Sequence, residues 1–294
     1  GKLRPEVAPD AGTPLGEQVR RLAAKLPDLT VAMDCTRPMP GPLRLSYSQL
    51  TEFSYCPRCF YVKYVLGLDE AKTTALSIGN IAHKALELFY RHFVVAEGEG
   101  APLPGLADLL KLADTEFDAE WPRHLPVDEA ERRRVHEQLE LAYTHLHSDT
   151  DEPVHLEKTV RLPYTLDGQT HTIVAKIDRV DRLADGGWRV IDYKTGYASK
   201  RLLEPQKDDL QMCIYAMALP RLLDPDAPED SAEEILKGEA QYWLLSSGER
   251  GRIDFADLKI DNVRQKIDSA ITAMLAGEFP RKDNCKGLCD LLPV

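Results

Sequence analysis

The chain has 294 residues, which suits one large domain or two small ones. Its net charge of −11 argues against a protein that coats nucleic acid, because such a protein needs a strongly basic surface. A local basic track beside an acidic site stays compatible with this charge. The sequence shows no run of about 18 apolar residues and no signal peptide, so we expect a cytoplasmic protein without a membrane partner.

The N-terminal segment, residues 1–45, is predicted to be a linker or a packing arm. It carries several prolines within Gly1–Pro42 and one plausible helix, Leu15–Leu26. Nowhere in the chain is there a G-x-x-x-x-G-K-[S/T] sequence, the loop that cradles nucleotide phosphates. We therefore expect no ATPase of that type within this chain.

A helical region follows, residues 46–150. Its first helix opens at Ser46 with a capping box, in which the side chains of Ser46 and Gln49 bond to each other's backbone N–H groups. The Cys56-Pro57 step interrupts this helix, because proline lacks the N–H group that a helix interior requires.

The second helix is predicted at about Ala75–Val95, where apolar residues recur with a helical period. His83 lies among them. An isolated histidine at such a position is most often a satisfied core residue, but the G-x-x-x-H pattern that it forms with Gly79 leaves a ligand role open. Two more helices are predicted, at about Leu106–Trp121 and Val127–His147.

Three antiparallel strands open the next segment, the predicted core at residues 151–276. Apolar and polar residues alternate from Val154 to Leu162, which is typical of a half-buried strand. Asp167-Gly168 is a hairpin signal. The second and third strands are predicted at Thr170–Leu183 and Trp188–Lys194.

Charged side chains gather where the second and third of these strands adjoin. Side chains alternate faces along a strand, so Asp192 and Lys194 point the same way, while Asp178 lies one hairpin away. Two carboxylates and one lysine at a single point can hold a divalent metal and a reacting phosphate. A lone D-x-K is commonly a surface ion pair, but the apolar strand before it and the second acidic strand favour a site. Glu157 is either an accessory acid or, as we favour, a surface glutamate.

A helix at about Asp208–Leu222 is predicted to follow a basic loop. Gln211 and Tyr215 stand four residues apart and therefore share one face of this helix. The remaining predicted elements are two strands, Gln241–Leu245 and Gly251–Phe255, a helix at Asp257–Leu275 and a cysteine-containing tail at residues 277–294.

Four blocks of the sequence together resemble the PD-(D/E)XK nuclease superfamily. More narrowly they resemble its RecB-like branch, whose members often form the C-terminal nuclease domain of UvrD/AddB-type helicases. The blocks, in family order from about Ser46, are SYSQLTEFSYCP, IGNIAHKALELFY, AKIDRV with VIDYKTG, and DDLQMCIYAMAL. The resemblance implies an α/β fold of restriction-endonuclease type over residues 46–294, with a mixed sheet flanked by helices and an N-terminal helical region.

The resemblance also implies a metal site for Mg²⁺ or Mn²⁺. Its ligands would be Asp178, Asp192, His83 and the backbone carbonyl of Tyr193. With the acidic strands present downstream, we favour this ligand role for His83 over a core role. Neutral imidazole is an acceptable ligand for Mn²⁺ and is tolerated near Mg²⁺.

The remaining catalytic candidates follow from the same resemblance. Lys194 would orient or deprotonate a water molecule, or stabilise the developing negative charge. Gln211 and Tyr215 match a Q-x-x-x-Y motif that lines the site, where they would position the water or the phosphate.

The resemblance predicts a metal-dependent DNA nuclease, acting as an exonuclease on single-stranded DNA ends. Such a module would belong to a helicase–nuclease in DNA repair or recombination, with a helicase domain or subunit as its partner. Two alternatives stay open. One is a stand-alone end-trimming nuclease related to CRISPR-adaptation nucleases, and the other is a non-catalytic scaffold that binds DNA ends.

The cysteines form a separate question. Without a secretory signal, disulfides are not expected, and clustered cysteines favour metal binding. The resemblance implies a [4Fe-4S] cluster held by Cys56, Cys285 and Cys289, although the C-x3-C spacing departs from the family's C-x2-C-x5-C pattern. Cys59 could instead complete a set of four thiolates, which also suits Zn²⁺. We rank iron–sulfur first, zinc second and no metal third.

Overall fold

The computed structural model describes residues 37–68, 74–121, 128–226, 236–283 and 285–287. They form two compact units. One comprises the described residues of 1–71 and 265–294, and the other is Lys72–Arg264. The helix expected at Leu15–Leu26 lies outside the described residues. The domain boundaries predicted at residues 45, 150 and 276 stay predictions.

The first unit begins with a short strand and a capped helix. Ser46 ends β1 (Arg44–Ser46), and its Oγ accepts the N–H of Gln49 at 3.3 Å while the side chain of Gln49 accepts the N–H of Ser46 at 2.8 Å. This confirms the capping box. As predicted, α3 (Tyr47–Tyr55) stops at the cysteine–proline step, and α4 (Pro57–Phe60) starts beyond it. A π-helical turn, Tyr61–Val65, follows.

Most of α10 (Ile260–Ala276) also belongs to this unit. Just beyond it, the ring of Phe279 lies among three aromatic rings of the N-terminal helices. Ring centres are 6.2 Å apart for Phe53, 6.2 Å for Phe60 and 4.7 Å for Tyr61. Aromatic pairs at these distances pack favourably. The segment that follows α10 is thereby joined to the helices at residues 47–65 within one unit.

The second unit is built on a mixed sheet. Its strands are β2 (Pro153–Leu166), β3 (Gln169–Arg182), β4 (Trp188–Lys194), β5 (Gly238–Leu244) and β6 (Glu249–Asp254). The predicted meander is confirmed, since β2, β3 and β4 pair antiparallel in that order. β5 then runs parallel to β4 and antiparallel to β6.

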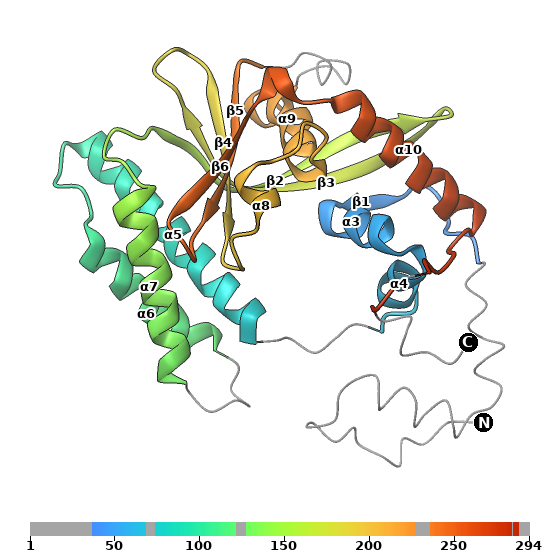
Figure 1. Ribbon diagram of the computed structural model, residues 1–294. Coiled ribbons are helices and arrows are strands. Elements are labelled where there is room, and N and C mark those ends of the chain that lie inside the picture. Colours follow the sequence, from blue (N-terminus) through green and yellow to red (C-terminus); the bar gives the residue numbers. More distant parts are fainter. Residues whose placement is uncertain (1–36, 69–73, 122–127, 227–235, 284, 288–294) are drawn as a thin grey trace. The chain divides into compact units, whose positions relative to one another are not determined.

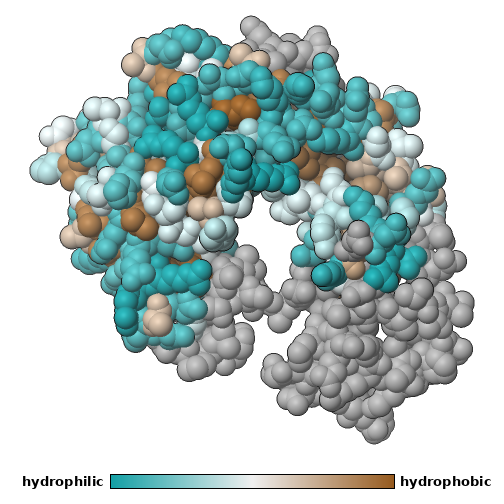
Figure 2. Space-filling view, in the orientation of Figure 1, coloured by the Kyte–Doolittle hydropathy of each residue, from teal (hydrophilic) through white to brown (hydrophobic). Residues whose placement is uncertain are grey.

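Helices cover both faces of this sheet (Figure 1). A core cluster joins α5 (Thr74–Glu99), α6 (Leu106–Glu120) and α7 (Glu129–His145) to Ile191 and Tyr193 of β4. The alternate residues of β4 face α9 (Leu210–Leu223), and the short α8 (Lys200–Leu203) lies beside β6. No helix in the described ranges is both long and apolar enough to cross a membrane. Figure 2 shows a mostly hydrophilic face on which hydrophobic residues are scattered.

A buried charge network stabilises the face of the sheet that α5 and α7 cover. Arg179 of β3 is fully buried, and its Nε and Nη2 donate to Asp181 at 2.5 and 2.7 Å. Nη2 also donates to Asp151 at 2.7 Å. The guanidinium carbon lies 3.9 Å from the ring centre of Tyr90 and 5.0 Å from that of Trp243. Such a buried cation compensates two carboxylates that have little access to water.

Replacing Arg179 by methionine should lower the free energy of unfolding by about 3–5 kcal/mol, because Asp151 and Asp181 would stay buried without their main cation. Urea unfolding followed by circular dichroism measures this loss. Lys237→Met is the control, since its exposed ion pair with Asp185 contributes about 0–1 kcal/mol. A loss for Arg179→Met no larger than that of the control would contradict the proposed role of the network.

Candidate functional site

Two buried carboxylates lie side by side at the point where β3 and β4 separate. The ladder pairs Val180 with Val190 and Arg179 with Ile191, and in continuation of this register Asp178 stands opposite Asp192. Both are almost fully buried, at 5% and 4% exposed. Burial raises the pKa of Asp178, and the negative charge of Asp192 adds to the rise against the opposing pull of His83. Two buried charges of the same sign on facing residues call for a compensating cation.

The peptide groups of Tyr193 face this carboxylate pair. Antiparallel pairing between β3 and β4 ends at Ile191, so the next residues of β4 are released from that ladder. The N–H of Tyr193 donates to Oδ2 of Asp178 at 2.8 Å instead. Its carbonyl oxygen lies 2.9 Å from Nε2 of His83. The predicted carbonyl ligand and the predicted histidine ligand are thus in direct contact.

His83 reaches the site from α5 because the helix comes close to the end of β4. One turn earlier is Gly79, where an added Cβ would lie 3.3 Å from Oγ1 of Thr195. Nδ1 of His83 lies 3.4 Å from Asp178 and 3.7 Å from Glu157. Burial alone would lower the pKa of His83, but the surrounding carboxylates outweigh it and raise the pKa to about 10. The site therefore attracts positive charge strongly.

Glu157 turns into the same cluster, whereas the alternation along its strand favoured a surface position. The strand register explains this position: Leu156 pairs with Arg179 and Lys158 with Ile177, so Glu157 falls opposite Asp178 and shares its face of the sheet. Glu157 itself has a φ of +48°, in the left-handed region. The side chain is 11% exposed, and Oε2 pairs with Lys176 at 2.5 Å. Oε1 has no hydrogen-bond partner among the described residues. Periodicity within one strand does not give this register, so the sequence left the position of Glu157 open.

Asp192 is held by a ring of polar side chains from β4 and α9. Its Oδ1 accepts from Nε2 of Gln211 at 2.5 Å and lies 2.7 Å from the hydroxyl of Tyr215. Its Oδ2 pairs with Nζ of Lys194 at 2.7 Å, and the same Nζ donates to Oε1 of Gln211 at 2.9 Å. The predicted face shared by Gln211 and Tyr215 is confirmed, since Gln211 Nε2 and the Tyr215 hydroxyl are 2.8 Å apart.

Asp209 fixes the start of α9 and with it the position of Gln211. Its Oδ1 accepts the N–H groups of Gln211 and Met212 at 3.0 and 3.1 Å, which is an N-cap. The hydroxyl of Tyr242 on β5 donates to the same oxygen at 2.8 Å. The side-chain amide of Gln211, which donates to Asp192, is therefore positioned by its own helix and, through Asp209 and Tyr242, by β5.

These donors fit a divalent cation. Ligand atoms of His83, Glu157 and Asp178 all lie within 4.8 Å of one another. The Tyr193 carbonyl contacts Nε2 of His83, while the two carboxylates face Nδ1 of the same ring. Imidazole, carboxylate and carbonyl groups together suit Mn²⁺, and the oxygen donors suit Mg²⁺. Asp192 is not part of this closest group, because both of its oxygens face α9 and Lys194.

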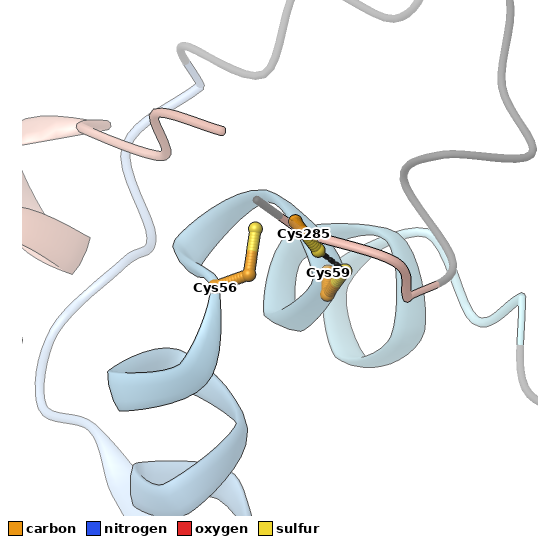
Figure 3. A group of neighbouring side chains, drawn as sticks. All are labelled: Cys56, Cys59 and Cys285. Carbon is orange, nitrogen blue, oxygen red and sulfur yellow. Dashed lines mark hydrogen bonds between the residues drawn. The ribbon is translucent and has the colours of Figure 1, made fainter. Parts of the chain in front are cut away.

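The cysteines gather apart from this site, in the first unit. Cys56, Cys59 and Cys285 have sulfur atoms that all lie within 4.8 Å of one another. Cys289 lies outside the described residues. Of the four thiolates considered from the sequence, the structure thus brings three together, and Cys59 is one of them (Figure 3).

The fold and the clustered acids define a nuclease class, and comparison with known families agrees. Residues 44–294 match the family described as the PD-(D/E)XK nuclease superfamily. The chain belongs to this superfamily. The match confirms the α/β fold class predicted from the sequence, with its mixed sheet flanked by helices.

Individual relatives agree with the RecB-like branch. A subunit of the ATP-dependent helicase/deoxyribonuclease of Streptococcus agalactiae serotype Ia is 30% identical over 88% of this chain and 24% of its own length. The corresponding protein of Moorella thermoacetica is 28% identical over 68% of this chain and 19% of its own length. This chain thus spans about a quarter or less of the relatives that it matches. The solved structure described as "Crystal structure of SSO0001" covers 87% of this chain and 86% of its own at 14% identity, with a TM-score of 0.34.

Glu157→Gln should weaken Mn²⁺ binding by at least about 10-fold, because the amide keeps the shape of the side chain and loses its charge. Isothermal titration calorimetry measures the affinity. Glu152→Gln is the control, since Glu152 is exposed close by in the sequence. An unchanged affinity in Glu157→Gln would remove Glu157 from the ligand set.

Proposed function

We propose that this chain is a metal-dependent deoxyribonuclease, a phosphodiester hydrolase that uses Mg²⁺ or Mn²⁺. One observation carries the proposal: Asp178 and Asp192 are buried on neighbouring strands beside a lysine that is held by hydrogen bonds. A structural ion pair would need only one carboxylate. The second carboxylate, with the histidine and the carbonyl oxygen that face it, is what cation-assisted hydrolysis requires.

The cation would be held by His83, Asp178 and the Tyr193 carbonyl, with Asp192 and Glu157 supplying further oxygens. When bound, the metal lowers the pKa of a water molecule and neutralises charge on the phosphate that is attacked. Binding the cation would displace the proton that the raised pKa of His83 keeps on the imidazole. Oε1 of Glu157, which lies 3.7 Å from Nδ1 of His83 and makes no hydrogen bond among the described residues, would be available to the cation.

Lys194 would act on the attacking water or on the developing negative charge. In the structure its ammonium group lies between Asp192 and Gln211, so its position does not depend on substrate. Burial raises the pKa of Tyr215, and the nearby charge of Asp192 adds to the rise, which keeps that phenol protonated as a donor. Gln211 and Tyr215 would therefore keep Asp192 and Lys194 oriented and position the water or phosphate.

We further propose single-stranded DNA ends as the substrate and a helicase as the partner. The descriptions of the relatives as helicase/deoxyribonuclease subunits support a DNA substrate and a helicase partner, and the single-stranded ends follow from the family resemblance alone. The chain has no phosphate-binding loop of the G-x-x-x-x-G-K-[S/T] type, so unwinding would come from another domain or subunit. The net charge of −11 supports a shared DNA path, since a partner would supply part of the basic surface.

Asp192→Asn and Lys194→Met should each lower the rate of DNA cleavage by at least about 100-fold, because Asp192 would supply oxygen to the cation and Lys194 would act on the reacting atoms. The assay follows end-labelled single- and double-stranded DNA with Mg²⁺, with Mn²⁺ and with EDTA. The product ladder also reports the polarity of cleavage.

Lys111→Met is the control for this experiment. It removes an exposed charge from α6 and should leave cleavage unchanged. Circular dichroism spectra like that of the wild type would show that the two site variants remain folded. Full activity in either variant would contradict the assigned roles, and no cleavage by the wild type with either metal would contradict the proposed activity of this chain.

A further inference from the structure

Three cysteine side chains meet in the first unit, although they come from opposite ends of the sequence. Cys56 and Cys59 belong to the start of α4, and Cys285 follows α10. Figure 3 shows the side chains of Cys59 and Cys285 facing each other, with Cys56 beside them. The Sγ atoms of Cys59 and Cys285 are 3.3 Å apart, and all three sulfurs lie within 4.8 Å of one another. Cys56 and Cys59 are fully buried, and Cys285 is 5% exposed.

Local backbone geometry places the two N-terminal sulfurs on one side of α4. Cys56 is extended, with φ −157° and ψ 112°, and serves as the residue before the helix that Pro57 opens. Cys59 follows three positions later, one helical turn on, so both side chains reach the same side. The cysteine–proline step that ends α3 therefore also positions Cys56 in this cluster.

The C-terminal side of the cluster is shaped by a turn and a glycine. The N–H of Cys285 donates to the carbonyl of Lys282 at 3.0 Å, and the N–H of Gly287 donates to Sγ of Cys285 at 3.3 Å. A Cβ added at Gly287 would lie 2.8 Å from Sγ of Cys59. The backbone therefore passes close to the sulfurs and directs an N–H group at one of them, which stabilises a thiolate.

We propose that these three thiolates bind a single tetrahedral ion of the zinc class, rather than the [4Fe-4S] cluster that the resemblance implies. Around a tetrahedral zinc with Zn–S bonds of about 2.3 Å, neighbouring sulfurs lie about 3.8 Å apart. The separation of 3.3 Å between the sulfurs of Cys59 and Cys285, and the limit of 4.8 Å that holds for all three pairs, are compatible with this value. In an iron–sulfur cube each thiolate binds its own iron and points away from the centre, which holds the sulfurs farther apart than this.

The spacing in the sequence supports the same ion. Structural zinc sites use pairs of cysteines separated by two to four residues. Cys56 and Cys59 form one such pair, and Cys285 and Cys289 have the spacing of a second. The three described thiolates carry the site, and they include Cys59, which the family pattern for an iron–sulfur cluster does not use.

Binding would lock the first unit together. The thiols lose their protons to solvent as the metal binds, and the ion then joins α4 to the segment beyond α10. The ring of Phe279 already packs on Phe53, Phe60 and Tyr61 in the same region. The metal would therefore stabilise the fold and take no part in hydrolysis.

Metal analysis of the full chain is the first test. The chain is purified without oxygen and without a nickel column, from cells supplied with both iron and zinc. We expect about one zinc per chain and no visible absorption of an iron–sulfur cluster. Several irons per chain with that absorption would overturn the proposal, and so would a metal-free chain with a disulfide between Cys59 and Cys285.

Titration of the metal-depleted chain with Co²⁺ tests the geometry. Tetrahedral thiolate coordination gives intense visible bands and sulfur-to-cobalt charge transfer, and we expect both. Weak bands alone, as six-coordinate Co²⁺ gives, would overturn the proposal. This measurement uses the wild-type chain and does not depend on whether a variant folds.

Cys59→Ser distinguishes a single zinc-class ion from a [4Fe-4S] cluster most sharply, because the family pattern for the cluster does not use Cys59. If a single ion is bound, the substitution removes one of its ligands and should lower the affinity for Zn²⁺ by at least about 100-fold. That loss exceeds the one expected from removing a group that only hydrogen-bonds to a ligand. Gly287→Ala should lower the affinity by about 10-fold through crowding of the sulfur. Cys213→Ser is the matched control, since it makes the same chemical change at a buried cysteine in the other unit. An unchanged metal content in Cys59→Ser would overturn the proposal.

Discussion

Two buried carboxylates on adjacent strands must be compensated by other groups of the second unit. Asp178 and Asp192 repel each other in a region with little water, where an uncompensated charge costs several kcal/mol. Each carboxylate is compensated by a different set of groups. Asp178 takes a backbone N–H and the positive charge of His83, while Asp192 takes Lys194 together with the donors of α9. These compensating groups lie on different elements, so the site forms only when helix α5, the sheet and helix α9 are all folded together.

The opposite face of the same strands is organised around a buried positive charge. There Arg179 is the buried cation, and Asp151 and Asp181 compensate it. Because side chains alternate along a strand, Arg179, the residue next to Asp178, faces the other side of the sheet and is the centre of this network. The sheet thus carries a negative layer toward α9 and a fixed ion network toward α5 and α7. In the second layer Nε and Nη2 of Arg179 are paired with carboxylates, whereas Nη1 has no hydrogen-bond partner among the described residues.

Much of this site could be predicted from the sequence because short-range rules determine it. Strand alternation put Asp192 and Lys194 on one side, the hairpin brought Asp178 beside them, and helical spacing placed Gln211 with Tyr215. The choice between a site role and a surface role for Glu157 could not be made from alternation within its own strand, because it depends on the register that brings Glu157 opposite Asp178. The meeting of Cys59 and Cys285 is equally invisible to local rules, since 226 positions separate them and tertiary packing alone brings them together. Spacing within each cysteine pair could be read from the sequence, but the distances between sulfurs decide which kind of metal group fits.

The early end of the ladder between β3 and β4 has a consequence for how this chain can vary. At Tyr193 the peptide group serves the polar site, while the aromatic ring packs in the hydrophobic cluster with the helices on the other face. A carbonyl oxygen is present in every amino acid, so no substitution at this position can delete that acceptor, and proline alone would delete the N–H. Selection on the side chain can therefore follow the needs of packing alone. One residue contributes to the chemistry and to the core through separate atoms, and the two contributions can evolve independently.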